Sequence, residues 1–287
     1  MKNRKVIFLV LALLWGFTAF AQQQMPQPLT YWSGYAVRPG KEDEFMNLVK
    51  TVGEPVRDKQ MAEGVVLGWG IEVPLLRSPG GWTHLIWYTV ADWSGIEKVQ
   101  SAIQAQLAKL AAEEAKATEE GRKKGQKPGT TTAERIREVF DSSKTRDWLT
   151  RDLVFVAGSA MLPAGLLPYT RYNFGKVKPG KAADFRAAWD KYNKPVLDKL
   201  VADGVILAYG LAVEELKTDG AWTHFIWYGV KSMDAFEKVR NAFGADRNRR
   251  SQEERDSIAA TFTKATDPDA ARQEVTRAIV FKLAGQK

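Results

Sequence analysis

The sequence contains no cysteine and only two histidines among its 287 residues. Without cysteine there can be no disulfide framework, no thiol nucleophile and no thiolate metal ligand. Stability must therefore come from a packed core, which a chain of this length can supply. The histidines form no HxH or HxxxH spacing, so we predict no metal site.

Long apolar runs are absent after the first twenty residues. Three basic residues precede the run Val6–Phe20, which is short for a membrane span, and Ala19-Phe20-Ala21 resembles a cleavage site. We expect residues 1–21 to be an export signal, so that a periplasmic or secreted chain begins at Gln22 and contacts no membrane. The alternative is an uncleaved N-terminal anchor.

Strong charge of one sign is also missing. The formal net charge of +8 includes three basic residues of the predicted signal, which leaves 8 − 3 = +5 for the mature chain. The dense basic runs, Arg122–Lys124 and Arg247–Arg250, lie in polar stretches without aromatic residues. They are typical of a solvated surface, and we expect no nucleic-acid partner. Glycine loops that would cradle phosphates are absent too.

An internal repeat is the main feature that is present. Shifted by 140 residues, the chain matches itself without a gap from Val37 to Val99, and WTHLIWY (Trp82–Tyr88) falls on WTHFIWY (Trp222–Tyr228). The two histidines occupy the same position of this motif. The match predicts two copies, residues 22–160 and residues 161–287.

Each copy follows the order strand, helix, strand, strand, helix, strand. A Pro-Gly turn begins the first helix, and Pro55 or Pro195 inside it should kink or break it. Thr131 and Ser251 begin capping boxes of a further short helix. The first copy carries an extra Ala/Glu/Lys-rich segment, residues 105–129, which predicts a solvated helical extension with a flexible tip; a partner-binding arm is the alternative.

The order βαββαβ predicts an α+β fold of two ferredoxin-like repeats, each with helices on one face of its sheet. With this order and the tandem arrangement, the chain resembles the dimeric α+β barrel superfamily, which includes antibiotic-biosynthesis-type monooxygenases, EthD-like and NIPSNAP-like proteins and haem-binding relatives. The resemblance implies that two sheets face each other around a barrel. Here one chain supplies both halves, so we expect a monomer with an internal pseudo-dimer.

The third strand indicates which side chains enter the barrel. Residues alternate between the two faces of a strand, so Trp82, His84, Ile86 and Tyr88 share one face. The second copy repeats all four, whereas the opposite face differs twice. We therefore predict that this face points into the barrel, with the histidines inside. The second strand has one large apolar face and one glycine-rich face; the glycines either leave room in the lumen or allow close packing under a helix.

These patterns predict a small apolar or aromatic ligand in the lumen. The candidate catalytic residues are the two histidines, and the candidate ligand-binding residues are Trp82, His84, Tyr88, Trp69, Glu72, Trp222, His224, Tyr228 and Tyr209. A histidine in a strand is most often structural, bonded to a carbonyl or hydroxyl. The resemblance leaves two enzymatic alternatives: a cofactor-independent monooxygenase with a histidine base, and a haem-binding enzyme with a histidine ligand. A structural or partner-binding module with a filled barrel is the third possibility.

Overall fold

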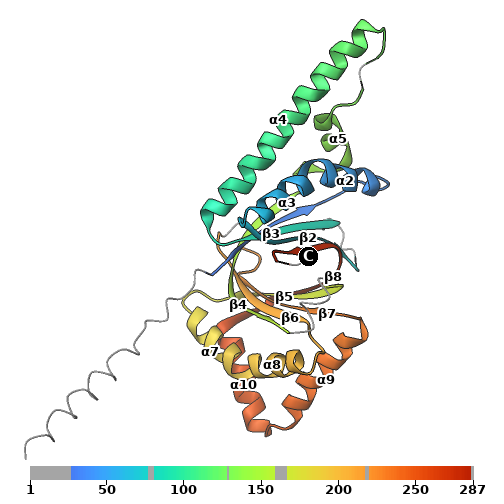
Figure 1. Ribbon diagram of the computed structural model, residues 1–287. Helices are drawn as coiled ribbons and strands as arrows, with labels where there is room; N and C mark the ends of the chain where they lie inside the picture. The colour runs from blue at the N-terminus through green and yellow to red at the C-terminus, as the bar shows by residue number, and fades with distance from the viewer. Residues whose placement is uncertain (1–26, 77–80, 128, 159–166, 217–219, 286–287) are drawn as a thin grey trace, which may run out of the picture.

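The computed structural model describes residues 27–76, 81–127, 129–158, 167–216 and 220–285. The predicted export signal, residues 1–21, lies outside these ranges, as does the junction between the two predicted copies at residue 160. Eight antiparallel strands close into one barrel, and helices cover it on two opposite sides (Figure 1). The predicted α+β fold of two facing repeats is confirmed.

Both repeats show the predicted order of elements. In the first repeat these are β1 (Leu29–Tyr35), α2 (Glu42–Leu48), the π-helix η1 (Val49–Gly53), α3 (Glu54–Ala62), β2 (Val66–Pro74), β3 (His84–Val90), α4 (Trp93–Lys123), α5 (Thr132–Val139), the 3₁₀ turn η2 (Ser142–Lys144) and β4 (Arg146–Ala157). In the second they are β5 (Tyr169–Val177), α7 (Ala182–Tyr192), α8 (Lys194–Ala202), β6 (Ala208–Glu214), β7 (His224–Val230), α9 (Asp234–Asn248), α10 (Gln252–Ala265) and β8 (Thr266–Leu283).

The two repeats are joined by their last strands. The order around the barrel is β1-β3-β2-β8-β5-β7-β6-β4, so β4 pairs with β1 of its own repeat and with β6 of the other. Likewise, β8 pairs with β5 and with β2. Backbone hydrogen bonds therefore run across both seams, and no strand edge is left open.

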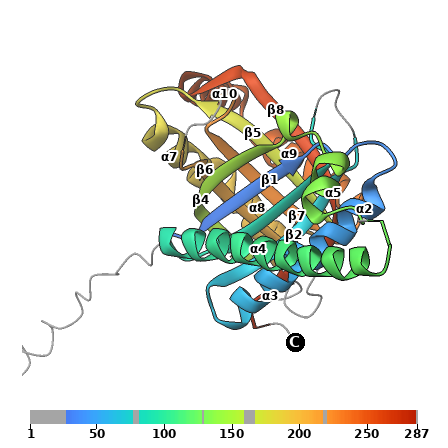
Figure 2. The ribbon, with the colours of Figure 1, turned by 90° about the horizontal axis from the view of Figure 1, so that it is seen from above.

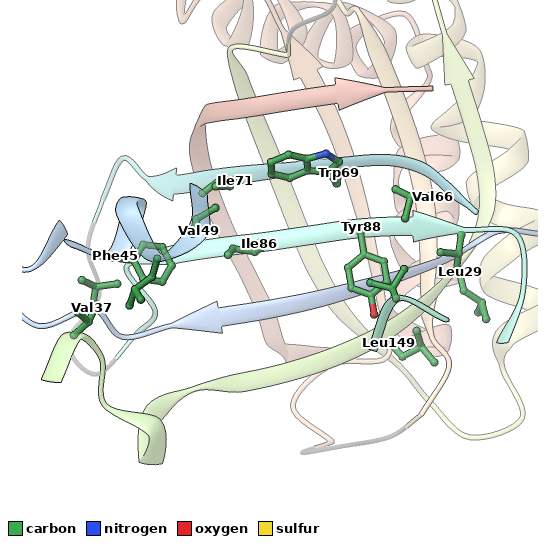
Figure 3. Close-up of a cluster of buried hydrophobic side chains, with 14 residues drawn as sticks. Leu29, Val37, Phe45, Val49, Val66, Trp69, Ile71, Ile86, Tyr88 and Leu149 are labelled. Atoms are coloured by element: carbon green, nitrogen blue, oxygen red, sulfur yellow. The ribbon is translucent and has the colours of Figure 1, made fainter. Parts of the chain in front are cut away.

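Each outer face of the barrel packs against its own helices. In the first repeat a buried cluster joins β1, β2 and β3 to α2 and α4, and the side chains of Ile86 and Tyr88 on β3 belong to it (Figure 3). A corresponding cluster joins β5, β6 and β7 to α7, α8, α9 and α10. These two clusters hold the large fully buried side chains Trp69, Trp189 and Tyr209.

The prolines act as predicted. Pro55 lies in the first turn of α3, after the π-helix η1, and Pro195 lies in the first turn of α8, after α7 has ended. Proline has no N–H to donate and is best tolerated in the first turn of a helix, so the long helix divides at this point in both repeats.

The extra segment of the first repeat continues α4 to Lys123, as the composition predicted, and the long helix extends beyond the barrel (Figures 1 and 2). Both capping boxes are present, at Thr131 and Ser251. Glu114 on α4 accepts hydrogen bonds from the Thr132 backbone N–H at 2.9 Å and from its hydroxyl at 2.6 Å, so the extension is tied to α5. Within the described ranges, no helix combines the length and apolar character needed to cross a membrane.

Candidate functional site

The prediction that both histidines point into the barrel was wrong. The ring of His84 lies 4.7 Å from the ring of Phe45 on α2, and that of His224 lies 5.3 Å from Phe185 on α7. Both histidines are buried between the sheet and the helices. Burial lowers the pKa of His224 to about 4, so its imidazole is neutral near pH 7.

Each histidine is held by its neighbour in the sequence. The Nδ1 atoms of His84 and His224 lie 3.1 Å and 2.9 Å from the hydroxyls of Thr83 and Thr223. The Thr83 hydroxyl also accepts a hydrogen bond from the backbone N–H of Val37, and Thr223 does the same for Val177. The WTH motif therefore ties the start of the third strand to the end of the first strand in the second repeat, and to the residue two positions after it in the first repeat.

Four predicted ligand-binding residues share this outward face. Trp69 and Tyr209 are fully buried under helices, and Trp69 donates from Nε1 to Asp58 at 2.9 Å. Tyr88 stacks on Tyr31 at 5.3 Å and accepts a hydrogen bond from Gln100. Tyr228 packs against Phe236 of α9. Placing these four side chains in the lumen was wrong, because their polar tips bond to helix residues or lie among them.

The other face of the third strands lines the lumen, with Leu85, Trp87 and Thr89 in β3 and Phe225, Trp227 and Gly229 in β7. A Cβ on Gly70 would lie 2.8 Å from the Trp87 indole, and Gly210 faces Trp227 in the same way. The glycines thus face the lumen and are also close-packing positions, since a tryptophan fills the space beside each of them.

One end of the lumen is closed by aromatic rings. Trp82 and Trp222, two of the candidate ligand-binding residues, lie at this end of the barrel in a cluster with Trp32, Leu85, Trp148, Tyr172, Phe174 and Phe225. Trp222 is 3% exposed, and its ring lies 5.4 Å from that of Phe174. This packing leaves about 30 Å³ of free space, so the closed end has no room for a ligand.

The other end contains a cavity of about 310 Å³. Aromatic and aliphatic side chains form most of its wall, and the polar side chains are three threonines, Tyr172 and two carboxyls, Glu72 and Asp152. Leu67 and Phe155 line it and are 40% and 52% exposed, which places its mouth beside them. The volume is at the lower end of the range for small-molecule sites.

Glu72, a predicted site residue, lies in the cavity wall and is saturated with donors. Trp87 donates from Nε1 to Oε1 at 3.0 Å, Tyr172 donates from its hydroxyl to Oε2 at 2.9 Å, and the Thr276 hydroxyl bonds to Oε2 as well. Burial raises the pKa of Glu72, and these three hydrogen bonds oppose the increase. This carboxyl joins β2, β3, β5 and β8 across the lumen.

Asp152 is the contrasting carboxyl, and sequence reasoning missed it. It lies at the β4 bulge, opposite Ala212 of β6. Burial alone raises its pKa to about 7, because none of the described residues donates a hydrogen bond to the carboxyl. The side chain is half-buried by area since it faces the cavity rather than packed atoms. Asp152 can therefore take up or release a proton near neutral pH.

The barrel has two equivalent strand pairs, β2 with β8 and β6 with β4, and each pair carries one carboxyl opposite one alanine. Glu72 on β2 pairs with Ala278 on β8, whereas Ala212, the counterpart of Glu72, pairs with Asp152 on β4. Both carboxyls thus come from the first repeat, on different strands, and each lies opposite an alanine of the second repeat. A comparison at the 140-residue offset could not find this, because the insertion in the first repeat gives the last strands an offset of 126.

The cavity wall does not fit haem. No histidine, cysteine or methionine stands among its described residues, and its one phenol, Tyr172, is bonded to Glu72. Lysine and arginine, which could pair with the propionate groups, are missing from that wall as well. Across the described ranges, no three side chains of the metal-binding types gather into a group that could hold a metal ion.

Known proteins resemble this chain in structure and not in sequence. The chain matches no protein-family model and no curated protein sequence at significant similarity. Among solved structures it is similar to a candidate monooxygenase of Fusobacterium nucleatum, with a TM-score of 0.57 at 12% identity over 91% of this chain and 96% of that one. A candidate monooxygenase of Lactobacillus acidophilus gives 0.54 at 8% identity over 91% and 98%. An anthrone oxidase-like protein gives 0.51 at 13% identity over 92% and 96%. These structures share the fold of this chain, in which one chain forms a closed α+β barrel from two repeats.

Proposed function

We propose that the barrel binds a small aromatic molecule that carries one hydrogen-bond donor, in the cavity beside Asp152. The observation that carries this proposal is a carboxyl to which no described residue donates a hydrogen bond, in the wall of a mostly aromatic and aliphatic cavity. A buried polar group without a partner is costly, so a site that leaves Asp152 unpaired is arranged for a ligand that pairs with it.

The walls set the remaining properties of the ligand. Indole and phenyl rings from Trp32, Trp87, Trp227, Phe155 and Phe281 line the cavity and favour a flat apolar body. Two carboxyls and no basic side chain in the described lining disfavour an anion. A neutral phenol or enol, or a protonated amine, satisfies both conditions.

The test compares two probes that differ in the donor. 2-Naphthol presents an O–H to Asp152, whereas 2-methoxynaphthalene has the same ring system and no donor. Binding is followed by quenching of tryptophan fluorescence, because three tryptophans line the cavity. We expect saturable binding of 2-naphthol that is about tenfold tighter than that of the ether, the effect of one hydrogen bond to a charged group.

Matched variants locate the binding. Asp152→Asn should weaken 2-naphthol about tenfold and leave the ether unchanged. Phe155→Ala, at the mouth, should weaken both probes alike. If Asp152→Asn binds 2-naphthol as wild type does, the ligand does not use this carboxyl and the proposal fails.

A second candidate function is cofactor-independent oxygenation, with Asp152 as the base in place of the histidines. A carboxyl with a pKa of about 7 beside an aromatic cavity is suited to remove a proton from an acidic C–H or O–H. With anthrone as the probe, the carboxylate would take a proton from the C10 methylene, and O₂ would oxidise the resulting anion. The balanced reaction is anthrone + O₂ → anthraquinone + H₂O.

Oxygen consumption with anthrone tests this candidate. We expect a rate above the buffer rate that rises with pH through about 7, as Asp152 ionises, and that Asp152→Asn abolishes. A rate equal to that of buffer would leave binding as the function of the cavity.

We also propose that the chain is exported, because its first 21 residues have the basic start, apolar run and small-residue cleavage site of a signal. Expression in a Gram-negative host, followed by fractionation and N-terminal sequencing, tests this directly. A periplasmic chain beginning at Gln22 is expected. A full-length chain in the membrane fraction would support the anchor instead.

A further inference from the structure

The second repeat contains another cavity, on the opposite side of its sheet from the lumen. Its volume is about 330 Å³, and it lies between the outer face of β5 and β7 and helices α8 and α9. The residues that line it are Arg171, Asn173, Asn193, Leu197, Ile226, Tyr228, Val239, Arg240 and Phe243. None of the residues that line the lumen cavity belongs to this set.

The polar part of this wall is cationic. Arg171 and Arg240 contribute two guanidinium groups, Asn173 and Asn193 contribute amides, and no acidic side chain stands among the described lining residues. Arg171 bonds to the side chain of Gln273 and interacts with the Tyr228 hydroxyl, and none of the described residues accepts a hydrogen bond from its buried Nε–H. Arg240 forms an exposed ion pair with Glu237, at 2.5 Å. Two guanidinium groups and two amides that line one cavity, with no carboxylate among the described lining residues, can bind an anion.

In the first repeat, one of the protein's own side chains fills the corresponding space. At the position of Leu197 it has Arg57, whose side chain is 6% exposed and lies over the rings of Trp69 and Tyr88 at 5.6 Å and 6.0 Å. Its guanidinium lies against Gly53, at the position of Asn193. The first repeat thus fills this space with its own cation.

The second repeat arranges the same elements differently. Its guanidinium is on the strand, where Arg171 stands at the position of Tyr31, and the shorter Leu197 leaves the space open. The remaining wall is formed by Leu197, Ile226, Val239 and Phe243, which suit an apolar body. A cationic end and an apolar end in one cavity match an amphipathic anion.

We propose that this cavity binds a small organic carboxylate, with its carboxylate at Arg171 and the asparagine amides and its apolar body against α8 and α9. The site is independent of the lumen, because the two cavities lie on opposite faces of the sheet.

The experiment uses sodium benzoate as the probe and inorganic phosphate as a comparison, with sodium chloride holding the ionic strength constant. Binding is measured by isothermal titration calorimetry on the full chain. We expect saturable benzoate binding, and phosphate binding at least several-fold weaker, because phosphate cannot use the apolar wall. Absence of saturable benzoate binding up to tens of millimolar overturns the proposal, and phosphate binding as tight as benzoate overturns its organic part.

Variants place the probe. Arg171→Gln should weaken benzoate about tenfold or more, since it removes a charge-assisted hydrogen bond. Lys191→Gln removes an exposed charge from the same repeat and should have no effect. Leu197→Arg gives the second repeat the side chain of the first and should abolish binding by occupying the cavity.

Two further variants are included, one at an exposed residue of the same cavity and one control in the lumen. Arg240→Gln, at an exposed position, should weaken benzoate even if one of the buried variants does not fold. Asp152→Asn, which alters the lumen, should leave benzoate unchanged. Loss of benzoate binding in Asp152→Asn, or unchanged binding in Arg171→Gln, would place the probe elsewhere and contradict the proposal.

Discussion

The two carboxyls of the lumen cavity, Glu72 and Asp152, differ in their hydrogen-bond partners, and this difference decides their roles. Glu72 is 3% exposed and accepts hydrogen bonds from Trp87, Tyr172 and Thr276, whereas no described residue donates to Asp152. Glu72 lies on β2, opposite Ala278 of β8, and Asp152 lies on β4, opposite Ala212 of β6, in the equivalent pair of strands. One carboxyl thus holds the barrel together, and the other is left for a ligand. Duplication allowed this division, because each role needs only one of the two positions.

The largest effect should come from removing the structural carboxyl. Glu72→Ala leaves the N–H of Trp87 and the hydroxyls of Tyr172 and Thr276 without an acceptor in a buried site, so we expect a loss of about 3–5 kcal/mol in the free energy of unfolding. Chemical denaturation measures it. Glu72→Gln retains two acceptor sites on its carbonyl oxygen and should lose only about 1–2 kcal/mol. A loss below about 1 kcal/mol for alanine would remove the distinction between the two carboxyls.

Replacing the second carboxyl, Asp152, should increase the free energy of unfolding, whereas replacing Glu72 should decrease it. Its pKa in the folded state is about 7, above the unfolded value, so the unfolded chain binds fewer protons between about pH 4 and 7. Stability therefore falls as the pH rises through this window. We expect Asp152→Asn to be more stable than wild type by about 1–3 kcal/mol at pH 8, because water in the cavity reduces the full linkage effect, and equal to it at pH 4.

Denaturation curves at several pH values test this difference. An Asp152→Asn variant less stable than wild type at pH 8 would show that the Asp152 carboxylate has hydrogen-bond partners in the folded protein. The proposed difference between Asp152 and Glu72 would then be wrong.

His224 acts in the reverse direction, and its contribution must be separated from that of Asp152. Its folded pKa of about 4 lies below the unfolded value, so the unfolded chain binds more protons between about pH 4 and 6.5. The stability that the neutral ring provides is present above that window and is lost as the pH falls through it. We expect His224→Gln to reduce this acid loss by about 1–2 kcal/mol. An unchanged pH profile in the variant would mean that the imidazole titrates normally.

The smallest effect should come from the helical extension, which lies outside the barrel. Glu114→Ala removes the acceptor for Thr132 at the start of α5, a capping interaction worth about 1 kcal/mol. We expect this loss in denaturation experiments, with 2-naphthol binding unchanged. A change in binding would show that the extension is coupled to the lumen.

The fold could be predicted because the sequence repeat and short local motifs define its elements. The matched spacing from Val37 to Val99, the Pro55 and Pro195 breaks and the capping boxes are all local signals, and the structure contains each of them. Closure into one barrel followed from the need of each sheet to cover its second face.

The site was harder to predict, because residues that are identical in the two copies were assigned to the ligand-binding lumen. From His84 to Tyr88 the invariant face packs against helices, where His84 needs Thr83 and Tyr88 needs Gln100, whereas Trp82 precedes the strand and lies in the lumen. The lumen face was freer to change, from Thr89 to Gly229 for example. Asp152 gave no distinctive signal, because it follows Arg151 in a strand that also carries Asp147. Its environment depends on pairing with β6 of the other repeat, which a single strand cannot reveal.

The most direct test of the account is the titration of Asp152 itself. Carbon-13 NMR of aspartate side-chain carboxyls, with the Asp152→Asn variant to assign the signal, gives its pKa with and without 2-naphthol. The account predicts titration near 7 in the free protein. With the probe bound, the pKa should fall, because the naphthol O–H donates to the carboxylate and stabilises the charged form. A free carboxyl that titrates near 4, with a pKa that 2-naphthol does not change, would contradict the assignment of this cavity as the ligand site.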